Sequence, residues 1–230
     1  MDLNQTTMAE AKTTKKTVKE EISLGEKMVN AFREYKLENG KDPSSIYSFC
    51  KHLKISESDF YSHYNSFAEI EREFWTNTFK KTVDKLKNSA EWESFSSREK
   101  LLAFYFTWFE DLLNHRSFAL LSFPKRPSLP NEEDLLKPLK HEFHQMVKEL
   151  MIEGESNGEI ANRKFISDKY ADLLWMQFVF LFDYWRKDSS KRFENTDAAI
   201  EKSVNLGFDL MGRGLVESLT DFAKFLLKSK

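Results

Sequence analysis

Several features that assign a chain to a particular class of protein are scarce in this sequence of 230 residues. The single cysteine, Cys50, excludes an intrachain disulfide and indicates a reducing compartment. Seven glycines and five prolines are few for this length, and alternating β-branched runs are absent, which favours an all-α chain. The longest apolar run, 173–182, is far shorter than the roughly 20 residues that span a bilayer, so we expect no membrane insertion.

Charge of one sign is also missing. Lys and Arg total 35 and Asp and Glu total 37, which gives a formal net charge of -2 and excludes a protein that coats nucleic acid through phosphate contacts alone. Any affinity for DNA must therefore come from a local site. The stretch 1–21 is polar, carries four lysines and has no apolar segment, so we predict a disordered basic-polar tail, no secretory signal and a cytoplasmic location.

The residue patterns of catalysis and cofactor binding do not stand out either. We find no Ser-His-Asp order, no glycine-rich phosphate loop and no carboxylate pair, and therefore predict no enzyme activity, no catalytic residue and no cofactor. His141 and His144 share a helix face at a spacing of three, but Glu142 faces away and no other Cys or His lies nearby in sequence. We therefore expect no metal site.

Helical periodicity is present along most of the chain. Leu24, Met28, Phe32 and Tyr35 form one apolar stripe, and similar stripes follow. We expect 116–123 to be a short apolar connector. We also expect Gly154 to end the helix at 132–153, and Gly212 to kink or end the last helix. The predicted helices cover about 22–38, 45–53, 57–64, 67–88, 98–114, 132–153, 163–187 and 196–212.

The segment 44–67 has the layout of a helix-turn-helix, in which the second helix enters the major groove of DNA. Ser44 or Ser45 is placed to cap the first of its two short helices. Ser56 is placed to cap the second, with Asp59 completing a capping box. The second helix carries the two acids Glu57 and Asp59 and no Lys or Arg.

The stretch between Met28 and Ile70 resembles the TetR family of bacterial transcriptional regulators. A helix, a glycine, a serine-capped second helix and a third helix ending in Y-x-H-Y-x-S follow one another in the register of that family. The positions that match are Ala31, Phe32, Gly40, Ser45, Ile46, Ile55, Ser56, Tyr61, His63, Tyr64 and Ser66.

The resemblance implies an all-α protein with a helix-turn-helix DNA-binding domain at 22–67 and a helical effector-binding and dimerisation domain at 68–230. It implies a repressor that binds a palindromic double-stranded operator as a homodimer. Each subunit would contribute its last two long helices, 163–187 and 196–212, to a four-helix bundle. A small-molecule effector bound in the body would change the separation of the two heads.

The candidate DNA contacts lie in the two short helices. The hydroxyl of Tyr61 is placed to donate to a phosphate, although a packing tyrosine is the alternative. Glu57 and Asp59 are most simply helix N-terminal acids, and base readout is their second interpretation. The residues predicted to face DNA are Ser45, Ser56, Glu57, Ser58, Asp59, Tyr61, Ser62 and His63.

Two departures from the family pattern support a second hypothesis. Lys54 stands where the family has glycine, so it must adopt a left-handed conformation or alter the turn. Phe67 stands where a basic residue normally reaches a phosphate. The alternative is therefore a TetR-fold lipid-binding or small-molecule-binding protein that has lost sequence-specific DNA binding.

The 21 phenylalanines indicate either a core of flat side chains or a cavity lined by them. Because members of the resembled family bind small-molecule effectors, the phenylalanines favour an apolar or amphipathic effector over a charged one. The residues predicted to line its pocket are Phe104, Trp108, Phe109, Phe143, Trp175, Phe178 and Phe182.

Overall fold

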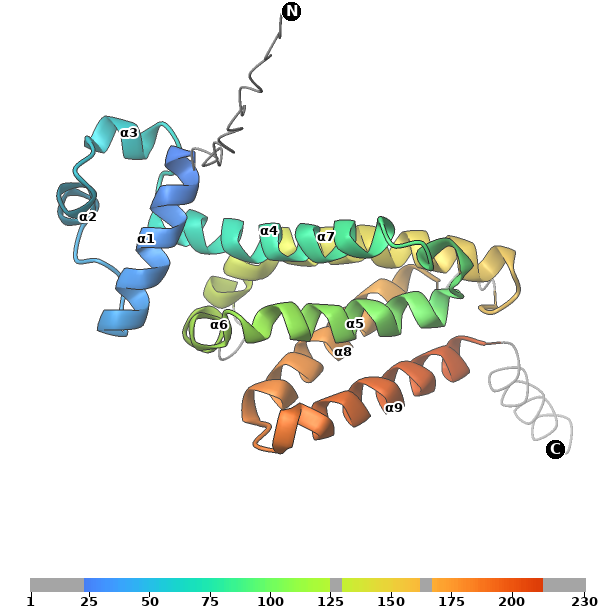
Figure 1. Ribbon diagram of the computed structural model, residues 1–230. Coiled ribbons are helices and arrows are strands. Elements are labelled where there is room, and N and C mark those ends of the chain that lie inside the picture. The colour runs from blue at the N-terminus through green and yellow to red at the C-terminus, as the bar shows by residue number, and fades with distance from the viewer. Residues whose placement is uncertain (1–22, 125–129, 162–166, 213–230) are drawn as a thin grey trace, which may run out of the picture.

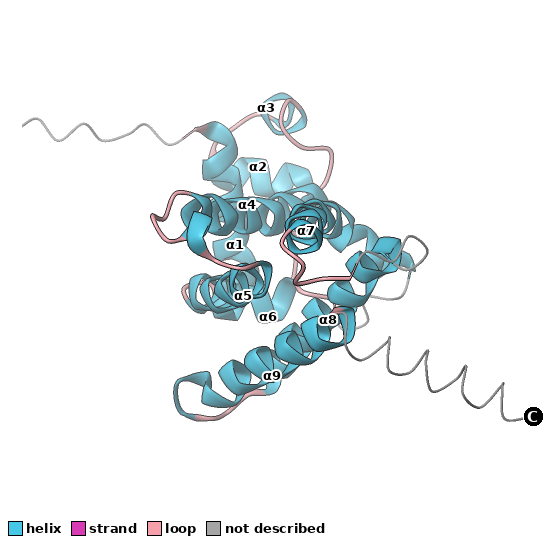
Figure 2. Cartoon of the chain, turned by 90° about the vertical axis from the view of Figure 1, so that its right-hand side faces the viewer, coloured by secondary structure: helices cyan, strands magenta, loops and turns pink. Residues whose placement is uncertain are grey.

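The computed structural model of the chain describes residues 23–124, 130–161 and 167–212. All regular secondary structure within these ranges is helical, which confirms the predicted all-α class (Figure 2). None of the described helices is long and apolar enough to cross a membrane. The predicted tail at 1–21 and the residues beyond 212 lie outside the described ranges.

Three helices stand at one end of the molecule (Figure 1). They are α1 (Leu24–Asn39), α2 (Ile46–Leu53) and α3 (Glu57–Tyr61), and we call them the head. A capping box opens each one, with Ser23, Ser45 and Ser56 as the N-caps. The predicted caps Ser45 and Ser56 are thus confirmed.

A helical body follows the head. The long helix α4 leaves the head and runs along the body, where it packs on α5 and α7 (Figure 1). The hairpin of α8 and α9 lies on the side of the body opposite to α3 (Figures 1 and 2). The body helices are α4 (Phe67–Lys87), α5 (Ser97–Leu113), α6 (Arg116–Ser122), α7 (Pro130–Ser156), α8 (Ser167–Lys187) and α9 (Glu194–Met211), with short 3-10 turns at Trp92–Ser94 and Lys191–Phe193.

The helix α3 is shorter than the predicted 57–64 and ends at Tyr61. Two side chains that follow it contact the carbonyl oxygen of Asp59. The hydroxyl of Ser62 donates to it at 2.7 Å, and Nδ1 of His63 lies 3.0 Å from it. Side chains that bond to a helical carbonyl in this way compete with continuation of the helix.

Two predictions around the middle of the body are wrong. Residues 116–123 were expected to be a connector, but Arg116–Ser122 form the helix α6. Gly154 was expected to end α7, but the helix continues to Ser156. Gly154 serves close packing instead, because a Cβ at this position would lie 2.6 Å from Cδ1 of Ile160. The left-handed residue after the helix is Gly158, with φ of 81°.

The last helix begins two residues before the predicted Thr196 and Asp197, with Phe193 as its N-cap. The hydroxyl of Thr196 does not cap α9, because it donates to Asp188 at the end of α8 over 2.6 Å. At the other end, α9 stops at Met211 and Gly212 is its C-cap, in agreement with the predicted end.

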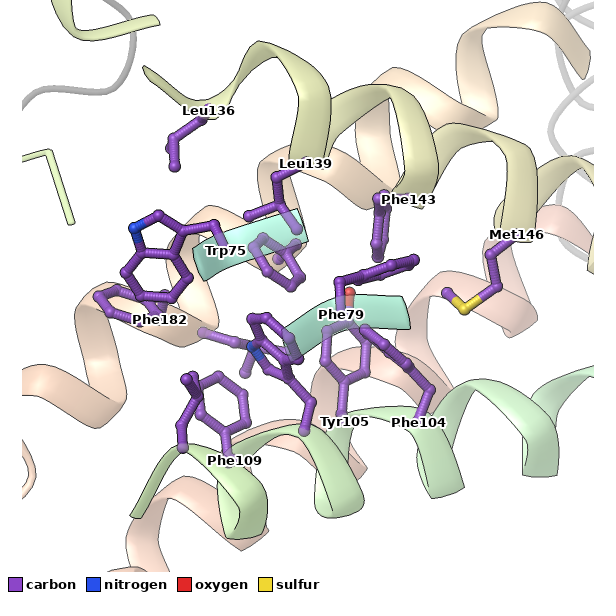
Figure 3. Packing of buried hydrophobic residues seen from close by; sticks show 14 of the residues in the cluster. Trp75, Phe79, Phe104, Tyr105, Phe109, Leu136, Leu139, Phe143, Met146 and Phe182 are labelled. Atoms are coloured by element: carbon purple, nitrogen blue, oxygen red, sulfur yellow. The ribbon is translucent and has the colours of Figure 1, made fainter. Parts of the chain in front are cut away.

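Aromatic side chains fill the interior of the body. Phe79 from α4 points toward Phe104 from α5 and Phe143 from α7, and Trp75, one turn earlier in α4, points toward Phe182 from α8 (Figure 3). Each of these five side chains is buried. Burial of an aromatic side chain contributes a large apolar area, so this cluster holds α4, α5 and α7 together.

Candidate functional site

The turn between α2 and α3 has the geometry that a helix-turn-helix requires. Lys54 adopts the left-handed conformation, with φ of 57° and ψ of 41°, and its amide donates to the carbonyl oxygens of Cys50 and Lys51. Phe49 and Phe60 are buried below the turn, with their ring centroids 6.1 Å apart in an edge-to-face contact. The lysine therefore occupies the conformation that glycine would adopt more readily.

The N-terminal side chains of α3 are mostly used to close the helix itself. Oδ2 of Asp59 accepts from the amide of Ser56 at 2.9 Å and from its hydroxyl at 2.7 Å, and the amide of Asp59 returns a bond to Ser56. The hydrogen bonds from Ser56 lower the pKa of Asp59. Asp59 is therefore a capping residue in the free protein.

The exposed surface of the head is formed by side chains with few internal bonds. Glu57, Ser58 and Tyr61 are exposed on α3, and no hydrogen bond of these side chains occurs within the described residues. The ring of Tyr61 contacts Phe60 edge-on, and 51% of the residue is accessible. These three side chains are the groups of α3 that remain free to meet a ligand.

The other predicted DNA contacts lie beside them. Ser45 and Ser56 are exposed at the starts of α2 and α3. Ser62 and His63 are exposed after α3, where the hydroxyl of Ser62 lies 2.8 Å from Nδ1 of His63. The structure thus gathers all eight predicted residues on the two short helices and their ends.

Phe67 belongs to the core of the head. Its ring stacks on Phe32 with centroids 5.3 Å apart and contacts Phe49 and Phe60 edge-on. This packing explains an aromatic residue at a position where the family pattern has a basic one. The head gains apolar contacts there and gives up a charged contact.

A stripe of large apolar side chains is exposed along α8. It consists of Leu173, Met176, Phe180 and Tyr184, which follow one another at helical spacing. Met176 is 67% accessible and Phe180 is 54% accessible. The opposite face of α8 is buried in the body, so this helix is apolar on two sides.

The adjacent helix α9 extends this apolar surface with Leu206 and Leu210. Gly207 lies between them and close to α8, because a Cβ there would be 3.9 Å from Cδ2 of Leu174. We call the exposed side chains of Leu173, Met176, Phe180, Tyr184, Leu206 and Leu210 the hairpin face. A contiguous apolar patch of this kind is typical of a surface that another protein covers.

Sequence reasoning missed the two residues that hold the α8–α9 hairpin. Asp188 accepts four hydrogen bonds, from the amide and hydroxyl of Ser190 and from the amide and hydroxyl of Thr196, at 2.6–2.8 Å. Although desolvation raises the pKa of Asp188, these bonds outweigh it and hold the pKa at about 2. The sequence D-S-S followed by a threonine was the available signal.

Arg116 is the second such residue. Its guanidinium donates to the carbonyl oxygens of Trp185 and Arg186 at the end of α8. The same group lies 4.3 Å from the ring centroid of Trp185 and 4.6 Å from that of Phe193. A cation at a helix C-terminus is favourable, and here it also links α6 to the hairpin.

The predicted pocket residues lie in and around the aromatic interior of the body. Phe104, Trp108, Phe143 and Phe178 contact one another, with the rings of Phe143 and Phe178 5.1 Å apart. Trp175 stacks on Phe178 at 5.1 Å and is partly exposed.

The last two predicted pocket residues join the same interior at its margin. Phe182 contacts Trp75, and Phe109 contacts Trp185. All seven side chains therefore meet in one aromatic region, where they fill space by packing on one another.

One polar atom in this interior has no partner. Nε1 of Trp108 is buried and forms no hydrogen bond within the described part of the chain. The neighbouring hydroxyl of Tyr105 donates to Oε1 of Gln177 at 3.2 Å, so that donor is satisfied. A buried indole N–H usually has a hydrogen-bond acceptor. Because Trp108 has none, an acceptor group of a bound ligand would be favoured at this point.

His144 of α7 is partly buried, and its Nε2 forms no hydrogen bond within the described residues. Nε2 of His144 lies 3.7 Å from Oδ1 of Asp172, which also pairs with Lys140, and Glu142 pairs with Lys80. Desolvation and the nearby Lys140 lower the pKa of His144.

Comparisons with known proteins agree with this architecture. A protein with unknown function from Rhodococcus sp. RHA1 has a similar structure, with a TM-score of 0.53 and 12% sequence identity over 86% of this chain and 100% of that chain. At this identity the similarity concerns the fold alone. No curated protein sequence matches the chain.

The family comparison is more specific. Residues 100–226, which make up more than half of the chain, match the family model of the tetracyclin repressor-like C-terminal domain. The matched range begins within α5 and includes the hairpin of α8 and α9. The family resemblance first seen between Met28 and Ile70 is thus joined by a match over the body, and the chain belongs to the TetR family.

Proposed function

We propose that this protein is a ligand-responsive transcriptional regulator, a repressor that binds palindromic operator DNA as a homodimer. The observation that carries the proposal is the helix-turn-helix of α2 and α3, in which Glu57, Ser58 and Tyr61 face solvent from a capped recognition helix. In this proposal 22–67 form the DNA-binding domain, and 68–230 form the effector-binding and dimerisation domain.

Phosphate contacts in this proposal come from groups around the recognition helix. The N-terminal ends of α2 and α3, at Ser45 and Ser56, carry the positive end of the helix dipole, which favours anions. Tyr61 adds a hydroxyl donor, and Lys51 and Lys54 add exposed positive charge at the end of α2. These groups compensate for the acids of α3, which leaves the expected affinity modest and dependent on salt.

The hairpin face supports the homodimer. Two copies that meet through α8 and α9 would bury Met176, Phe180 and Leu206 in an isologous four-helix bundle. An obligate interface of this type is more apolar than the rest of a protein surface, as this face is.

The aromatic interior supports an apolar or amphipathic effector. Because Trp108, Phe143 and Phe178 already pack on one another, the effector would enter by separating α5 from α8. An acceptor group on the effector would then meet Nε1 of Trp108. Such a rearrangement of the body is the change that the heads would respond to.

The test of DNA binding is selection of bound sequences from random duplex DNA by the full chain, followed by titration of the selected site at several salt concentrations. We expect a palindrome whose half-sites lie about one helical turn apart. Tyr61→Phe removes only the hydroxyl and should weaken binding severalfold. Ile152→Ala, an exposed apolar position on α7, is the control that should leave it unchanged. Recovery of no preferred sequence would contradict the proposal.

The second candidate function is a TetR-fold lipid or small-molecule binder without sequence-specific DNA binding. It is favoured by one observation, that α3 exposes two acids and no Lys or Arg. The same selection separates the two functions. A protein of the second kind would bind DNA weakly and without sequence preference, and mass spectrometry of the purified protein would detect a copurified apolar ligand.

A further inference from the structure

A cleft of about 400 Å³ lies where the head meets the body, and none of the predicted effector-pocket residues lines it. It is bounded by the first half of α1, the middle of α4 and the junction of α5 with α6. Its size is within the range of about 300–1,000 Å³ that is typical of small-molecule sites. Neither the helix-turn-helix nor the hairpin face accounts for it.

Two cations in this cleft lack an anionic partner. Arg33 of α1 and Lys81 of α4 both line it, and within the described residues neither forms an ion pair with a carboxylate. Nη1 of Arg33 instead lies 3.3 Å from Nδ1 of His115. Because a guanidinium can only donate, Nδ1 of His115 is the acceptor, and the proton of the neutral imidazole is on Nε2.

The charges of both cations act on His115. Desolvation lowers the pKa of His115, and the charges of Arg33 and Lys81 lower it further, while Asp111 acts in the opposite direction. The imidazole is therefore neutral near pH 7. The cleft thus holds one guanidinium, one ammonium and a neutral imidazole whose Nε2–H is a further donor.

The acids that line the same cleft are already engaged. Asp111 accepts from Thr82 at 2.9 Å and from Lys85 at 3.1 Å. Glu73 accepts from Asn77 at 3.1 Å, and Glu26 accepts from the amide of Ser23 in the capping box of α1. Their presence disfavours a ligand with two negative charges, because like charges repel at short range.

The remaining surface of the cleft is partly apolar. The ring of Phe74 lines it and contacts His115 edge-on, with centroids 5.8 Å apart. Val29 of α1 lies in the same lining. The cleft therefore combines two cations that form no ion pair within the described residues with an aromatic surface.

We propose that this cleft binds a small organic monocarboxylate, whose carboxylate accepts from Arg33 and Lys81 while its apolar part lies on Phe74. The planar fork of an arginine matches a carboxylate in a bidentate manner, and the ammonium of Lys81 adds a second charge. The inference concerns binding alone and does not depend on whether the chain reads DNA. A ligand in this position would touch α1 and α4 at once.

The test is isothermal titration calorimetry of the full chain with benzoate, butyrate and acetate. We expect benzoate to bind, and Lys81→Gln and Arg33→Gln to raise its Kd at least tenfold. Lys80→Gln is the matched control, because Lys80 directly precedes Lys81 in α4 but pairs with Glu142 of α7 at 3.0 Å. This variant should change the Kd less than twofold.

Two further probes test the chemistry of recognition. Benzamide has the same ring as benzoate without the charge, and inorganic phosphate has more charge without the ring, so both should bind at least tenfold more weakly. Absence of binding by all three carboxylates would overturn the proposal, and so would equal effects of Lys81→Gln and Lys80→Gln. Lys81 is exposed, so its variant keeps the test valid if the half-buried Arg33 proves necessary for folding. Operator binding is not the readout, which keeps failure of this site distinct from failure of the regulator proposal.

Discussion

The helices α3 and α8 both present side chains to solvent, but their exposed surfaces differ in kind. The exposed side chains of α3 are polar, and its capping residues Ser56 and Asp59 satisfy each other within the head. Between Leu173 and Tyr184 every exposed side chain of α8 is large and apolar, with Met176 and Phe180 both more than half accessible. A polar surface of this kind is stable in water and suits a partner that comes and goes. An apolar stripe is costly to leave in water and suits a permanent partner.

The largest effect is expected when a charge is placed in the hairpin face, because this tests whether its apolar surface is an interface. Met176→Glu should raise the dimer dissociation constant at least 100-fold, about 3 kcal/mol, because an unpaired carboxylate would be buried at the interface. Sedimentation equilibrium measures this constant. Ile152→Glu on α7 is the matched control, since Ile152 is 71% accessible and lies outside the hairpin face. A dimer that is unaffected by Met176→Glu would show that α8 is not the interface.

The next largest effect concerns the residue that holds the hairpin. Asp188→Asn should lower the free energy of unfolding by about 2 kcal/mol at pH 7, because an amide replaces a carboxylate that accepts four hydrogen bonds. Chemical denaturation measures this change. Asp84→Asn, at an exposed aspartate of α4, should change it by less than about 0.5 kcal/mol.

The pKa of Asp188 also predicts how the stability of the protein depends on pH. The pKa of Asp188 is about 2 in the folded state, below its ordinary value of 3.8. A carboxyl group whose pKa is lower in the folded state stabilises the fold at every pH above its pKa in the unfolded state. The contribution of Asp188 is therefore present above pH 3.8 and is lost as the pH falls toward 2. The wild type and Asp188→Asn should therefore converge in stability between pH 4 and pH 2. A constant difference across this range would contradict the assignment.

A smaller effect is expected at the turn of the head. Lys54→Gly should raise the stability of the protein by about 0.5–1 kcal/mol, because glycine adopts the left-handed conformation of this residue without strain. The counterpart is Gly40, which has φ of 67° at the end of α1. Gly40→Ala should lower stability by about 1 kcal/mol. Thermal unfolding of both variants checks the pair, and equal signs would contradict the conformational explanation.

The smallest effect concerns the charge on α3. If α3 approaches DNA as proposed, Glu57→Gln should tighten binding about twofold at low salt, because it removes a negative charge from the vicinity of the phosphates. Fluorescence anisotropy with labelled duplex measures this change. Glu93→Gln, at an exposed acid far along the body, should leave the affinity unchanged. Equal affinities of Glu57→Gln and wild type would place α3 away from the phosphates.

Most of the helices were predictable from the sequence because their signals are local. Apolar spacing along α1, the caps at Ser45 and Ser56, and the left-handed Gly40 each depend on residues within a few positions of one another. The predictions that failed depend on distant partners. Gly154 did not end α7 because Ile160 packs against it, and Thr196 did not cap α9 because its hydroxyl donates a hydrogen bond to Asp188.

The candidate sites divide in the same way. The eight residues predicted to face DNA lie within one short segment, 45–63, so the motif alone placed them together on α2, on α3 and at their ends. The cleft brings together Arg33, Lys81 and His115, and Arg33 and His115 are 82 positions apart in the sequence. No sequence motif links these three residues. Only packing of α1 against the body brings these groups into one space.

The sequence by itself determined the all-α class, the helix-turn-helix and the family resemblance, because backbone propensity, capping and apolar periodicity act over one or two helical turns. The tertiary structure decided which apolar residues are covered and which remain exposed. Phe178 and Phe180 are both aromatic residues of α8, yet the first is buried and the second is 54% accessible. The difference arises because neighbouring helices bury only one side of α8, and no local pattern specifies which side that is.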